Sequence, residues 1–465
     1  MNVEQIYTGC LAQGAYYIES NGEAAIIDPL REVDDYIARA EKDNAKIKYI
    51  FETHFHADFV SGHLTLAEKT GAEIVYGHLA NPKFNCTIAS DNQEFRIGDV
   101  TIVAIHTPGH TMESTTYLLR DKEGKDHCIF SGDTLFLGDV GRPDLAQKAA
   151  DMTQEQLAGT LFDSLRNKIM PLADDVIVYP GHGAGSACGK NMMKETVDSL
   201  GNQKRMNYAL RADMTRDEFI AEVTDGLAPP PAYFPLNVQM NKEGYKHIDE
   251  VIKKSKVGLT PEAFEVVANE TDAVILDVRH ESKFVKGFIP QSIFIGIDGG
   301  FAPWVGALIK DVIQPILLVS DEDKIKEVVT RLSRVGFDNV IGFLRGGFEA
   351  WKEEGMEIDS IRSISAESFE QEWSKNGKHV LDVRKAGEWD TLHLQNAKHI
   401  CLSRLSEELA QVPKQGKFYV HCAGGYRSVI AASILKMRGY HNLIDVAGGF
   451  DAIKKTNLPM ADVLV

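Results

Sequence analysis

The 465-residue sequence is poor in several features, and each absence excludes a class of protein. Only six cysteines are present and none forms a CxxC pair, which is too few for a disulfide framework in a chain of this length. No apolar run approaches the ~20 residues of a membrane-spanning helix. The N-terminal stretch lacks the basic and apolar segments of a secretory signal. We therefore expect a reduced, cytoplasmic protein without membrane association.

Positive charge is also scarce. The 67 Asp and Glu residues outnumber the 50 Lys and Arg residues, which gives a formal net charge of −17. A basic surface for nucleic acid or for an anionic membrane is not expected from this balance. With 44% hydrophobic residues the composition is that of an ordinary globular protein, and the length allows about two to four domains.

The first part of the chain repeats one local design. Two buried strands are expected at 24–29 and 47–54, each ending where polar residues begin. Three further apolar segments, at 100–110, 127–136 and 175–183, run into loops that carry Gly together with His or Asp. Loops at strand ends are where a β scaffold commonly places functional residues.

A proline-rich break closes this first part. Residues 225–237 read DGLAPPPAYFPLN, and their four prolines predict an irregular segment. A charged helix and a linker are expected at 242–256. The sequence therefore predicts a first domain over residues 1–257.

The remainder contains an internal repeat. AVILDVRHESKF matches HVLDVRKAGEW, and the glycine-pair segment at 334–351 matches the one at 437–454. Both blocks recur at a spacing of roughly 100 residues, which predicts two copies of one α/β unit built around a parallel sheet. We expect these copies at 258–359 and 360–465.

Histidine and aspartate side chains gather at the strand ends of the first part. Imidazole together with carboxylate suits Zn, Fe, Mn or Ni rather than Ca or Mg. The residues alone predict a transition-metal site, but their spacing does not say which of two adjacent histidines contacts the metal. The candidates lie in four separate loops and are His54, His56, Asp58, His110, Asp133 and His182.

Four motifs resemble those of the metallo-β-lactamase superfamily, namely THFHADF, TPGHT, SGDTLF and YPGHG. The resemblance covers the whole first segment and implies an αββα sandwich. Dinuclear hydrolases of this superfamily, such as glyoxalase II, follow the pattern HxHxDH, in which the Asp and the final His bind a second metal. The final position here is Phe59, whose ring has no lone pair to donate. The second metal site should therefore be disabled or severely weakened.

The resemblance is more specific to the persulfide dioxygenase branch of the superfamily, and it implies one Fe(II) per chain. A face of two histidines and one carboxylate is typical of non-haem iron enzymes that activate O₂. The implied iron ligands are His54, His110 and Asp133. The implied supporting residues, which orient ligands or substrate, are His56, Asp58 and His182.

Two further residues of the first part are candidates for substrate contact. Arg142, in the motif GRPD, matches an arginine that helps to hold the thiol substrate in this branch, and a surface salt bridge is the alternative. Cys188 lies six residues past His182 and is a candidate to face the site and carry sulfur. The alternative for Cys188 is a small buried thiol with a packing role.

A second candidate site lies in the last part of the chain. YVHCAGGYRSVIAASILKMRGY predicts a strand, a loop and a helix, with Cys422 at the start of the loop. Backbone N–H groups of the loop and of the helix N-terminus should stabilise a thiolate, and Arg427 adds positive charge. The same cradle suits an anionic persulfide, sulfite or thiosulfate. The other residues expected to line it are Gly424, Gly425, Tyr426 and Ser428.

The loop CAGGYR, with LDVR before it and GGF after it, resembles the rhodanese family over residues 363–465. This resemblance implies sulfane-sulfur transfer through a persulfide on Cys422. The first copy resembles the family in its flanks only. Its position equivalent to Cys422 is Ser320, and its loop SDEDKI has no thiol and would repel an anion. We therefore expect the first copy to be inactive.

Together the motifs resemble persulfide dioxygenase–rhodanese fusions over nearly all of the chain. The fold expected is a multidomain α/β protein, with a metallo-β-lactamase αββα sandwich followed by two rhodanese-like domains. The implied reaction is oxidation of a thiol persulfide, such as that of glutathione or coenzyme A, by O₂ to sulfite and thiol, coupled to the formation or use of thiosulfate. A homo-oligomer with a role in sulfide detoxification is expected.

A different class of function is the alternative. In this interpretation the chain is a glyoxalase II-like thioester hydrolase with two zinc ions, and both rhodanese-like units act only as interaction modules.

Overall fold

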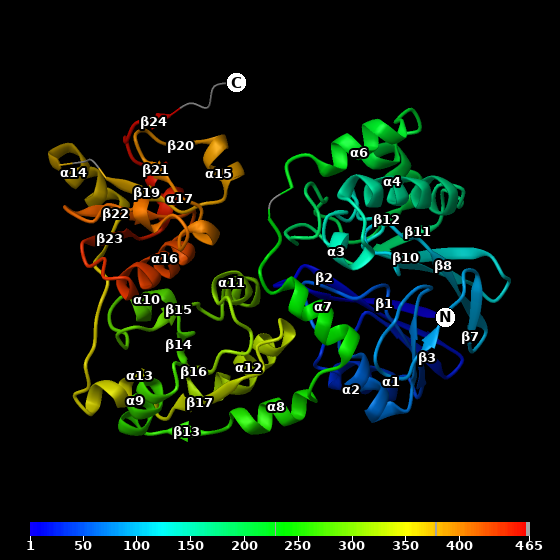
Figure 1. Cartoon of the computed structure of the whole chain (residues 1–465), viewed down its shortest axis with the longest axis horizontal. Coiled ribbons are helices and arrows are strands. Elements are labelled where there is room, and N and C mark those ends of the chain that lie inside the picture. The colour runs from blue at the N-terminus through cyan, green and yellow to red at the C-terminus, as the bar shows by residue number, and fades with distance from the viewer. Residues whose placement is uncertain (228, 377–378, 462–465) are drawn as a thin grey trace. The chain divides into compact units, whose positions relative to one another are not determined.

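The structure is a computed structural model, and it describes residues 1–227, 229–376 and 379–461. The chain divides into two compact units (Figure 1). Unit 1 consists of Met1–Glu250 and Leu332–Gly336, and unit 2 consists of Val251–Arg331 and Phe337–Val465. Within the described ranges, every helix is too short or too polar to cross a lipid bilayer.

Unit 1 contains two six-stranded sheets. The strands of the first are β1 (Asn2–Thr8), β2 (Gln13–Ser20), β3 (Glu23–Ile27), β4 (Lys46–Phe51), β5 (Glu73–Tyr76) and β6 (Thr87–Ile88). Those of the second are β7 (Gln93–Ile97), β8 (Val100–His106), β9 (Thr115–Arg120), β10 (Asp126–Gly132), β11 (Ile177–Pro180) and β12 (Asp198–Ser199). The strand orders are β1-β2-β3-β4-β5-β6 and β12-β11-β10-β9-β8-β7.

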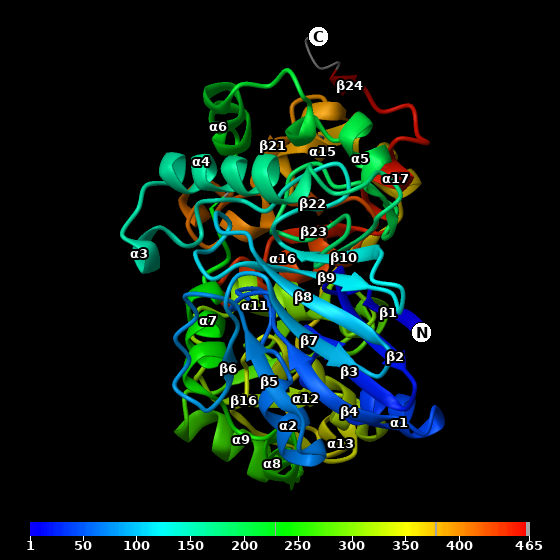
Figure 2. The same cartoon turned by 90° about the vertical axis from the view of Figure 1, so that its right-hand side faces the viewer.

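Helices cover the outer faces of the two sheets. They are α1 (Asp34–Lys42), α2 (His63–Thr70), α3 (Gln147–Ala150), α4 (Gln154–Ser164), α5 (Leu200–Met206), α6 (Arg216–Thr224) and α7 (Phe234–Glu243). In Figure 2 the blue and cyan strands lie between α4 on one side and α2 on the other. α8 (Ile248–Ser255) follows in the chain, and its residues from Val251 onward belong to unit 2.

Alternation along the strands explains the four layers. Tyr16 of β2 and Phe130 of β10 belong to one buried cluster between the two sheets. Tyr17, the next residue of β2, instead packs in a cluster with Tyr36 of α1, on the opposite face of the same sheet. Val178 of β11 is buried with residues of α4 on the outside of the second sheet. The expected αββα sandwich is therefore confirmed.

The expected elements of the first part are present, with one correction. α2 ends at Gly71, which has a left-handed φ of 73°. The proline-rich segment is not irregular throughout, because α7 begins inside it at Phe234. Pro235 lies in the first turn of α7, where the missing N–H has no intrahelical acceptor, so it does not prevent the helix.

Unit 2 contains two parallel five-stranded sheets of the same design. The first is built from β13 (Gly258–Leu259), β14 (Val274–Asp277), β15 (Ile293–Phe294), β16 (Ile316–Val319) and β17 (Val340–Leu344). The second is built from β18 (Ser363–Ile364), β19 (Val380–Asp382), β21 (Lys398–His399), β22 (Phe418–His421) and β23 (Leu443–Val446). Their orders, β13-β17-β16-β14-β15 and β18-β23-β22-β19-β21, match position by position.

Short helices connect these strands. Those of the first copy are α9 (Pro261–Glu270), α10 (Glu281–Phe284), α11 (Phe301–Leu308), α12 (Ile325–Arg334) and α13 (Gly347–Glu353). Those of the second are α14 (Ala366–Asn376), α15 (Ala386–Thr391), α16 (Tyr426–Met437) and α17 (Gly449–Ile453). A separate pair, β20 (His393–Leu394) with β24 (Met460–Ala461), completes the second copy. In Figure 1 the first copy is green to yellow and the second is orange to red.

The repeated sequence LDVR forms the same buried ion pair in both copies. Arg279 Nη2 lies 2.6 Å from Asp277 Oδ2, and Arg384 Nη2 lies 2.6 Å from Asp382 Oδ2. All four side chains are buried. Each pair lies at the end of β14 or β19, and removal of one partner would leave a buried charge unpaired and cost about 3–5 kcal/mol.

Candidate functional site

Strand ends of unit 1 bring three of the candidate ligands together. His54 follows β4, His110 follows β8, and Asp133 follows β10. One nitrogen of each histidine and one oxygen of Asp133 all lie within 4.8 Å of one another. His54 Nε2 is 3.9 Å and His110 Nε2 is 3.5 Å from Asp133 Oδ2. Each of the three residues is only 2% exposed, so the cluster is shielded from water.

The other ring nitrogen of each histidine is already hydrogen-bonded. His110 Nδ1–H donates to the backbone carbonyl of Arg142 over 2.8 Å. Thr53 Oγ1 donates to Asp28 Oδ2 over 2.8 Å and lies 3.0 Å from His54 Nδ1, so this hydroxyl accepts from the His54 ring. In both rings the Nε2 lone pair is left facing the carboxylate of the cluster.

Both lone pairs face the carboxylate of Asp133. Among the described residues, no hydrogen-bond donor satisfies either oxygen of Asp133. Burial, and then the neighbouring rings of His56, His110 and His182, hold the pKa of His54 well below its usual value, so its ring stays neutral. The two imidazole rings and the buried carboxylate, arranged in this way, fit a cation between them. The donor set is that of a transition metal.

A second group of potential ligands lies beside the first. His56, Asp58 and His182 each bring one atom within 4.8 Å of the others. His182 Nε2 lies 3.4 Å from Asp58 Oδ2 and 3.5 Å from Asp133 Oδ1. Within the described residues neither ring nitrogen of His182 has a hydrogen-bond partner. Burial raises the pKa of Asp58, an effect that the nearby His182 opposes.

The surroundings of His56 differ from those of His54. His56 Nε2 lies 3.0 Å from Asp28 Oδ1 and 3.4 Å from Glu52 Oε2. Burial by itself disfavours the charged ring, but these two carboxylates raise the pKa of His56 well above its usual value. A protonated imidazole has no lone pair for a metal. The two carboxylates therefore shift the pKa of His56 in the opposite direction from that of His54, a difference that the sequence did not show.

Phe59 is fully buried and stacks on His56, with ring centroids 4.2 Å apart and planes at 29°. Asn241, from α7, fixes this loop from the other side. Its Nδ2 donates to the carbonyls of His56 and Phe59, each over 2.8 Å, and its Oδ1 accepts from the backbone N–H of Ser61. The helix that sequence reasoning missed therefore positions the metal loop.

Cys188 faces the site. Its sulfur lies within 4.8 Å of atoms of Asp133 and His182. Burial, followed by the Asp58 and Asp133 carboxylates, raises the pKa of the Cys188 thiol well above its usual value. Tyr233 is a buried neighbour that sequence reasoning missed, and burial, then Asp58 and Cys188, raises its pKa. Its position inside the proline-rich break gave no local signal of a role.

Arg142 is buried beside the cluster rather than exposed in a surface salt bridge. Its guanidinium donates to both oxygens of Asp144, each over 2.7 Å, and to the carbonyl of Ala187 over 3.2 Å. Its own carbonyl accepts from His110. Arg142 therefore orients a candidate ligand through its backbone while its side chain is held in one direction.

The cysteine loop of unit 2 begins where β22 ends. Cys422 is 1% exposed, and the backbone N–H of Gly425 donates to its sulfur over 3.1 Å. Gly425 has a φ of 109°, a conformation that favours glycine. α16 starts at Tyr426, directly after this turn. The loop therefore points at least one N–H donor at the sulfur. The space that a side chain at Gly424 would enter is open.

Two side chains brace the rest of the loop. Arg427 donates to both oxygens of Glu388, over 2.6 and 2.8 Å. This pairing raises the pKa of Arg427 and lowers the pKa of Glu388. Ser428 Oγ lies 2.9 Å from the Gly425 carbonyl and 2.7 Å from Asp445 Oδ1. Arg427 is therefore an anchored charge rather than a mobile one.

Sequence reasoning did not find Glu388 or a second cysteine, Cys401. Cys401 and Cys422 both contribute to the raised pKa of Arg427, after Glu388, so all three groups lie near the guanidinium. Glu388 belongs to α15 and Cys401 follows β21, and only the folded sheet brings these segments to the loop.

The equivalent loop of the first copy has different chemistry. Ser320 follows β16, is buried, and donates to the carbonyl of Asp321 over 3.0 Å. Glu322 accepts from the backbone N–H of Gly346 over 2.7 Å. The loop thus offers a hydroxyl and carboxylates where the second copy offers a thiol and N–H donors.

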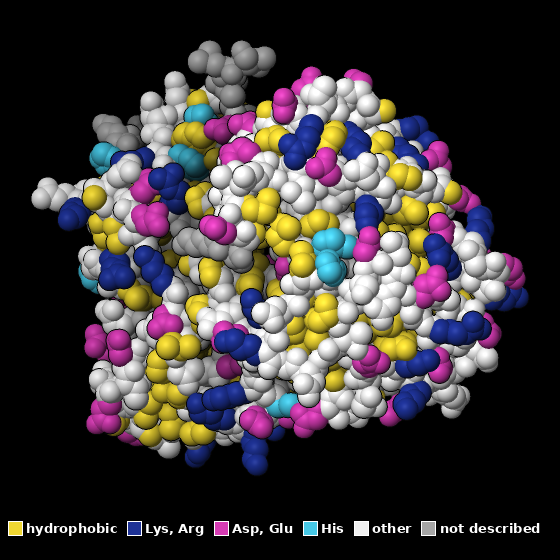
Figure 3. All heavy atoms as spheres, turned by 45° about the vertical axis from the view of Figure 1, so that its right-hand side comes forward, with side chains coloured by type: hydrophobic (Ala, Val, Ile, Leu, Met, Phe, Trp, Pro, Cys, Tyr) yellow, Lys and Arg dark blue, Asp and Glu magenta, His cyan; other side chains and the backbone are white. Residues whose placement is uncertain are grey.

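On the face drawn in Figure 3, Lys and Arg side chains are intermixed with Asp and Glu, without a continuous basic patch.

Comparison with known proteins agrees with this architecture. The family model described as metallo-beta-lactamase superfamily matches residues 8–182, and the model described as rhodanese-like domain matches 260–354 and 365–456. The crystal structure of a metallo-beta-lactamase from Staphylococcus aureus subsp. aureus COL is 30% identical, with a TM-score of 0.65, over 74% of this chain and 98% of that one.

Two curated relatives each match less than half of this chain. A cytoplasmic hydroxyacylglutathione hydrolase from Arabidopsis thaliana is 35% identical over 178 residues, which are 37% of this chain and 65% of the relative. A mitochondrial persulfide dioxygenase from Homo sapiens is 27% identical over 221 residues, which are 47% of this chain and 78% of the relative. Relatives whose names give two different activities therefore each match part of this chain.

Proposed function

Because the chain belongs to the metallo-β-lactamase superfamily and continues into two rhodanese-like domains, we propose that it is an enzyme of sulfur metabolism that oxidises a thiol persulfide and transfers sulfane sulfur. We assign the oxidation to residues 1–257, an inactive rhodanese-like domain to 258–359, and sulfur transfer to 360–465. We extend the proposal to a homo-oligomer in the cytoplasm, where reducing conditions suit six free cysteines.

The first proposed reaction converts a low-molecular-weight persulfide, RSSH, with O₂ and water into the thiol RSH, sulfite and two protons. The outer sulfur loses electrons and O₂ is the oxidant. Glutathione, coenzyme A or a similar thiol is the carrier. One Fe(II) bound by His54, His110 and Asp133 would supply the redox chemistry with O₂.

The chain's own residues support this role of the cluster. The hydrogen bonds to Thr53 and to the Arg142 carbonyl fix the tautomers of the two histidines. Burial keeps bulk water from the reacting sulfur. The Arg142 guanidinium, held by Asp144, presents a fixed positive charge for an anionic thiol carrier, and Cys188 lies close enough to accept sulfur.

In the second reaction the Cys422 thiolate attacks the outer sulfur of thiosulfate. The S–S bond breaks, sulfite leaves with the bonding electron pair, and Cys422 carries the sulfur as a persulfide. An acceptor thiolate then removes this sulfur and regenerates the Cys422 thiolate. The reverse sequence consumes the sulfite made by the first reaction, so fusion of the two domains keeps the shared intermediate at high local concentration.

The observation that carries the proposal is that one complete set of ligands stands beside a loop that lacks a histidine for a second metal. His54, His110 and Asp133 form one compact face, while Phe59 occupies the position at which the dinuclear hydrolase pattern has a histidine. The alternative is a two-zinc thioester hydrolase, which the Arabidopsis relative favours.

An oxygen electrode with glutathione persulfide, combined with metal analysis, tests the proposal. We expect about one iron per chain and O₂ uptake with sulfite formation. A Cys422→Ser variant should keep O₂ uptake and lose thiosulfate sulfurtransferase activity. Two zinc ions per chain with no O₂ uptake would refute the oxidation, and full sulfurtransferase activity in Cys422→Ser would refute the transfer step.

A further inference from the structure

The catalytic loop of the second rhodanese-like copy makes a contact outside its own domain. Tyr426 Oη donates to the backbone carbonyl of Gly296, in the first copy, over 2.7 Å. The ring of Tyr426 also meets Phe294 edge-on, with centroids 5.9 Å apart and planes at 67°. Burial, and then the nearby Glu281 and Asp298 carboxylates, raise the pKa of Tyr426, so its phenol stays protonated and remains a donor.

Two glycines of the first copy make room for this ring. A Cβ added to Gly299 would lie 2.3 Å from Tyr426 Cζ, and one added to Gly296 would lie 3.2 Å from Tyr426 Cε2. Neither glycine has a left-handed φ, so the requirement is space rather than backbone conformation. At Gly299 any side chain would displace the tyrosine.

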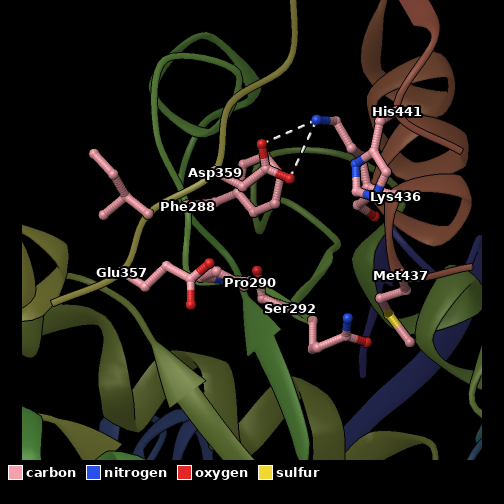
Figure 4. A pocket seen from close by; sticks show the side chains of 11 residues that line it. Phe288, Pro290, Ser292, Glu357, Asp359, Lys436, Met437 and His441 are labelled. Carbon is pink, nitrogen blue, oxygen red and sulfur yellow. Dashed lines mark hydrogen bonds and ion pairs between the residues drawn. The ribbon is translucent and has the colours of Figure 1, made fainter. Parts of the chain in front are cut away.

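Further contacts fix the rest of the helix that carries the loop. The backbone N–H of Phe294 donates to Ser433 Oγ, in the middle of α16, over 3.0 Å. At the end of α16, Lys436 Nζ lies 2.9 and 3.1 Å from the two oxygens of Asp359. Figure 4 shows this pair at the rim of a pocket of about 350 Å³ lined by both copies. The helix is thus held along its length, from the Cys422 loop to its C-terminus.

The geometry at the sulfur depends on these contacts. Gly425, whose N–H donates to Cys422 Sγ, directly precedes Tyr426 in the chain. A shift of the tyrosine ring therefore moves the donor that faces the reacting sulfur. Displacements of about 1 Å at such a donor reduce rates by up to about 100-fold.

We propose that the first rhodanese-like copy, which has no thiol of its own, is the positioning partner of the Cys422 loop and acts by receiving Tyr426 between Gly296 and Gly299. The proposal rests on the sulfur-transfer function of Cys422. It gives the inactive copy a specific task, which is to fix the donor geometry of the active one.

The test uses the full-length chain and a double-mutant cycle. Gly299→Ala places a methyl group in the space of the tyrosine ring, and Tyr426→Leu shortens the side chain so that the methyl group can be accommodated. Gly300→Ala is the matched control, because a Cβ there first meets Trp304 at 3.3 Å. Tyr426→Phe removes only the hydroxyl.

Three readouts are measured on each variant: kcat and KM for thiosulfate sulfurtransfer, the rate of Cys422 alkylation by iodoacetamide at pH 7 followed by peptide mass spectrometry, and the thermal midpoint. We expect Gly299→Ala to lower kcat by about tenfold or more and to slow alkylation severalfold, with KM changed less than kcat. Gly300→Ala should match the wild type. Tyr426→Phe should lower kcat by about two- to tenfold.

The cycle provides the decisive comparison. If the ring and the glycine interact directly, Gly299→Ala has almost no further effect on kcat or alkylation in the Tyr426→Leu background. An equal loss in both backgrounds, or a Gly299→Ala variant within twofold of the wild type, would overturn the proposal. If Gly299→Ala does not fold, Tyr426→Phe decides the outcome, and wild-type kcat and alkylation in that variant would overturn it. Alkylation needs no turnover, so failure of the Cys422 function would be recognised separately.

Discussion

Replacement of Phe59 by histidine is the perturbation that most directly probes the metal centre. Phe59 is fully buried and its ring lies 4.2 Å from that of His56. In the second group of potential ligands, which includes His56, His182 Nε2 lies 3.4 Å from Asp58 Oδ2 and 3.5 Å from Asp133 Oδ1. Three ligands of a second cation site are therefore already close together, and Phe59→His supplies a fourth donor.

The expected change in folding stability follows from the burial of residue 59. Without a second metal, the new imidazole leaves a buried polar group unpaired, which destabilises the fold by about 1–3 kcal/mol. For a unit of this size each 1 kcal/mol lowers the thermal midpoint by about 2–4 °C. A second metal ion at about 100 times its dissociation constant would return about 2.7 kcal/mol. The variant should therefore be less stable than the wild type after chelation and regain stability when metal is added.

The assay combines metal analysis with thermal unfolding at increasing Zn²⁺ or Fe²⁺. We expect Phe59→His to hold about two metal ions per chain, against about one for the wild type, and to gain several degrees with metal. Phe59→Leu is the matched control, since it removes the ring without adding a donor, and its stoichiometry should stay at about one. An unchanged stoichiometry in Phe59→His, with no metal-dependent shift, would refute the view that residue 59 decides between one metal and two.

Three further outcomes are expected. Thr53→Val removes the hydroxyl that accepts from His54 Nδ1, so iron affinity should fall by about 10–100-fold in a chelator competition, and unchanged affinity would contradict the assigned tautomer. Because Arg427 lowers the pKa of Glu388, their pair stabilises the fold fully above the unfolded-state pKa of about 4.3 and loses this effect as the pH falls through the lower folded-state pKa. Glu388→Gln should therefore destabilise the fold at pH 7 in urea unfolding and have little effect only below that lowered folded-state pKa, and an effect independent of pH would contradict this linkage. Arg384→Met leaves a buried carboxylate unpaired and should lower the unfolding free energy of unit 2 by about 3–5 kcal/mol, whereas a loss under 1 kcal/mol would contradict the role given to the repeated LDVR.

Much of the fold follows from local sequence. Strands ended near the predicted positions because apolar runs stop where polar loops begin, as at Phe51 before the THFHADF loop. The repeat was recognisable because each copy builds the same buried ion pair, at the end of β14 and of β19. α7 was missed because four prolines outweighed its helical pattern, although Pro235 occupies a position that tolerates proline.

For the candidate sites too, some features follow from the local sequence and others only from the tertiary structure. The sequence by itself determined which residue types stand at the ends of strands. It therefore predicted a group of potential metal ligands around His54 and a thiol loop at Cys422. Only the tertiary structure separated His54 from His56, because Asp28 and Glu52 act on one ring through space. Only the tertiary structure paired Tyr426 with a glycine pocket of the preceding copy. Local pattern reports the face on which a side chain lies, whereas the protonation and position of a buried group depend on charges and contacts brought by distant segments of the chain.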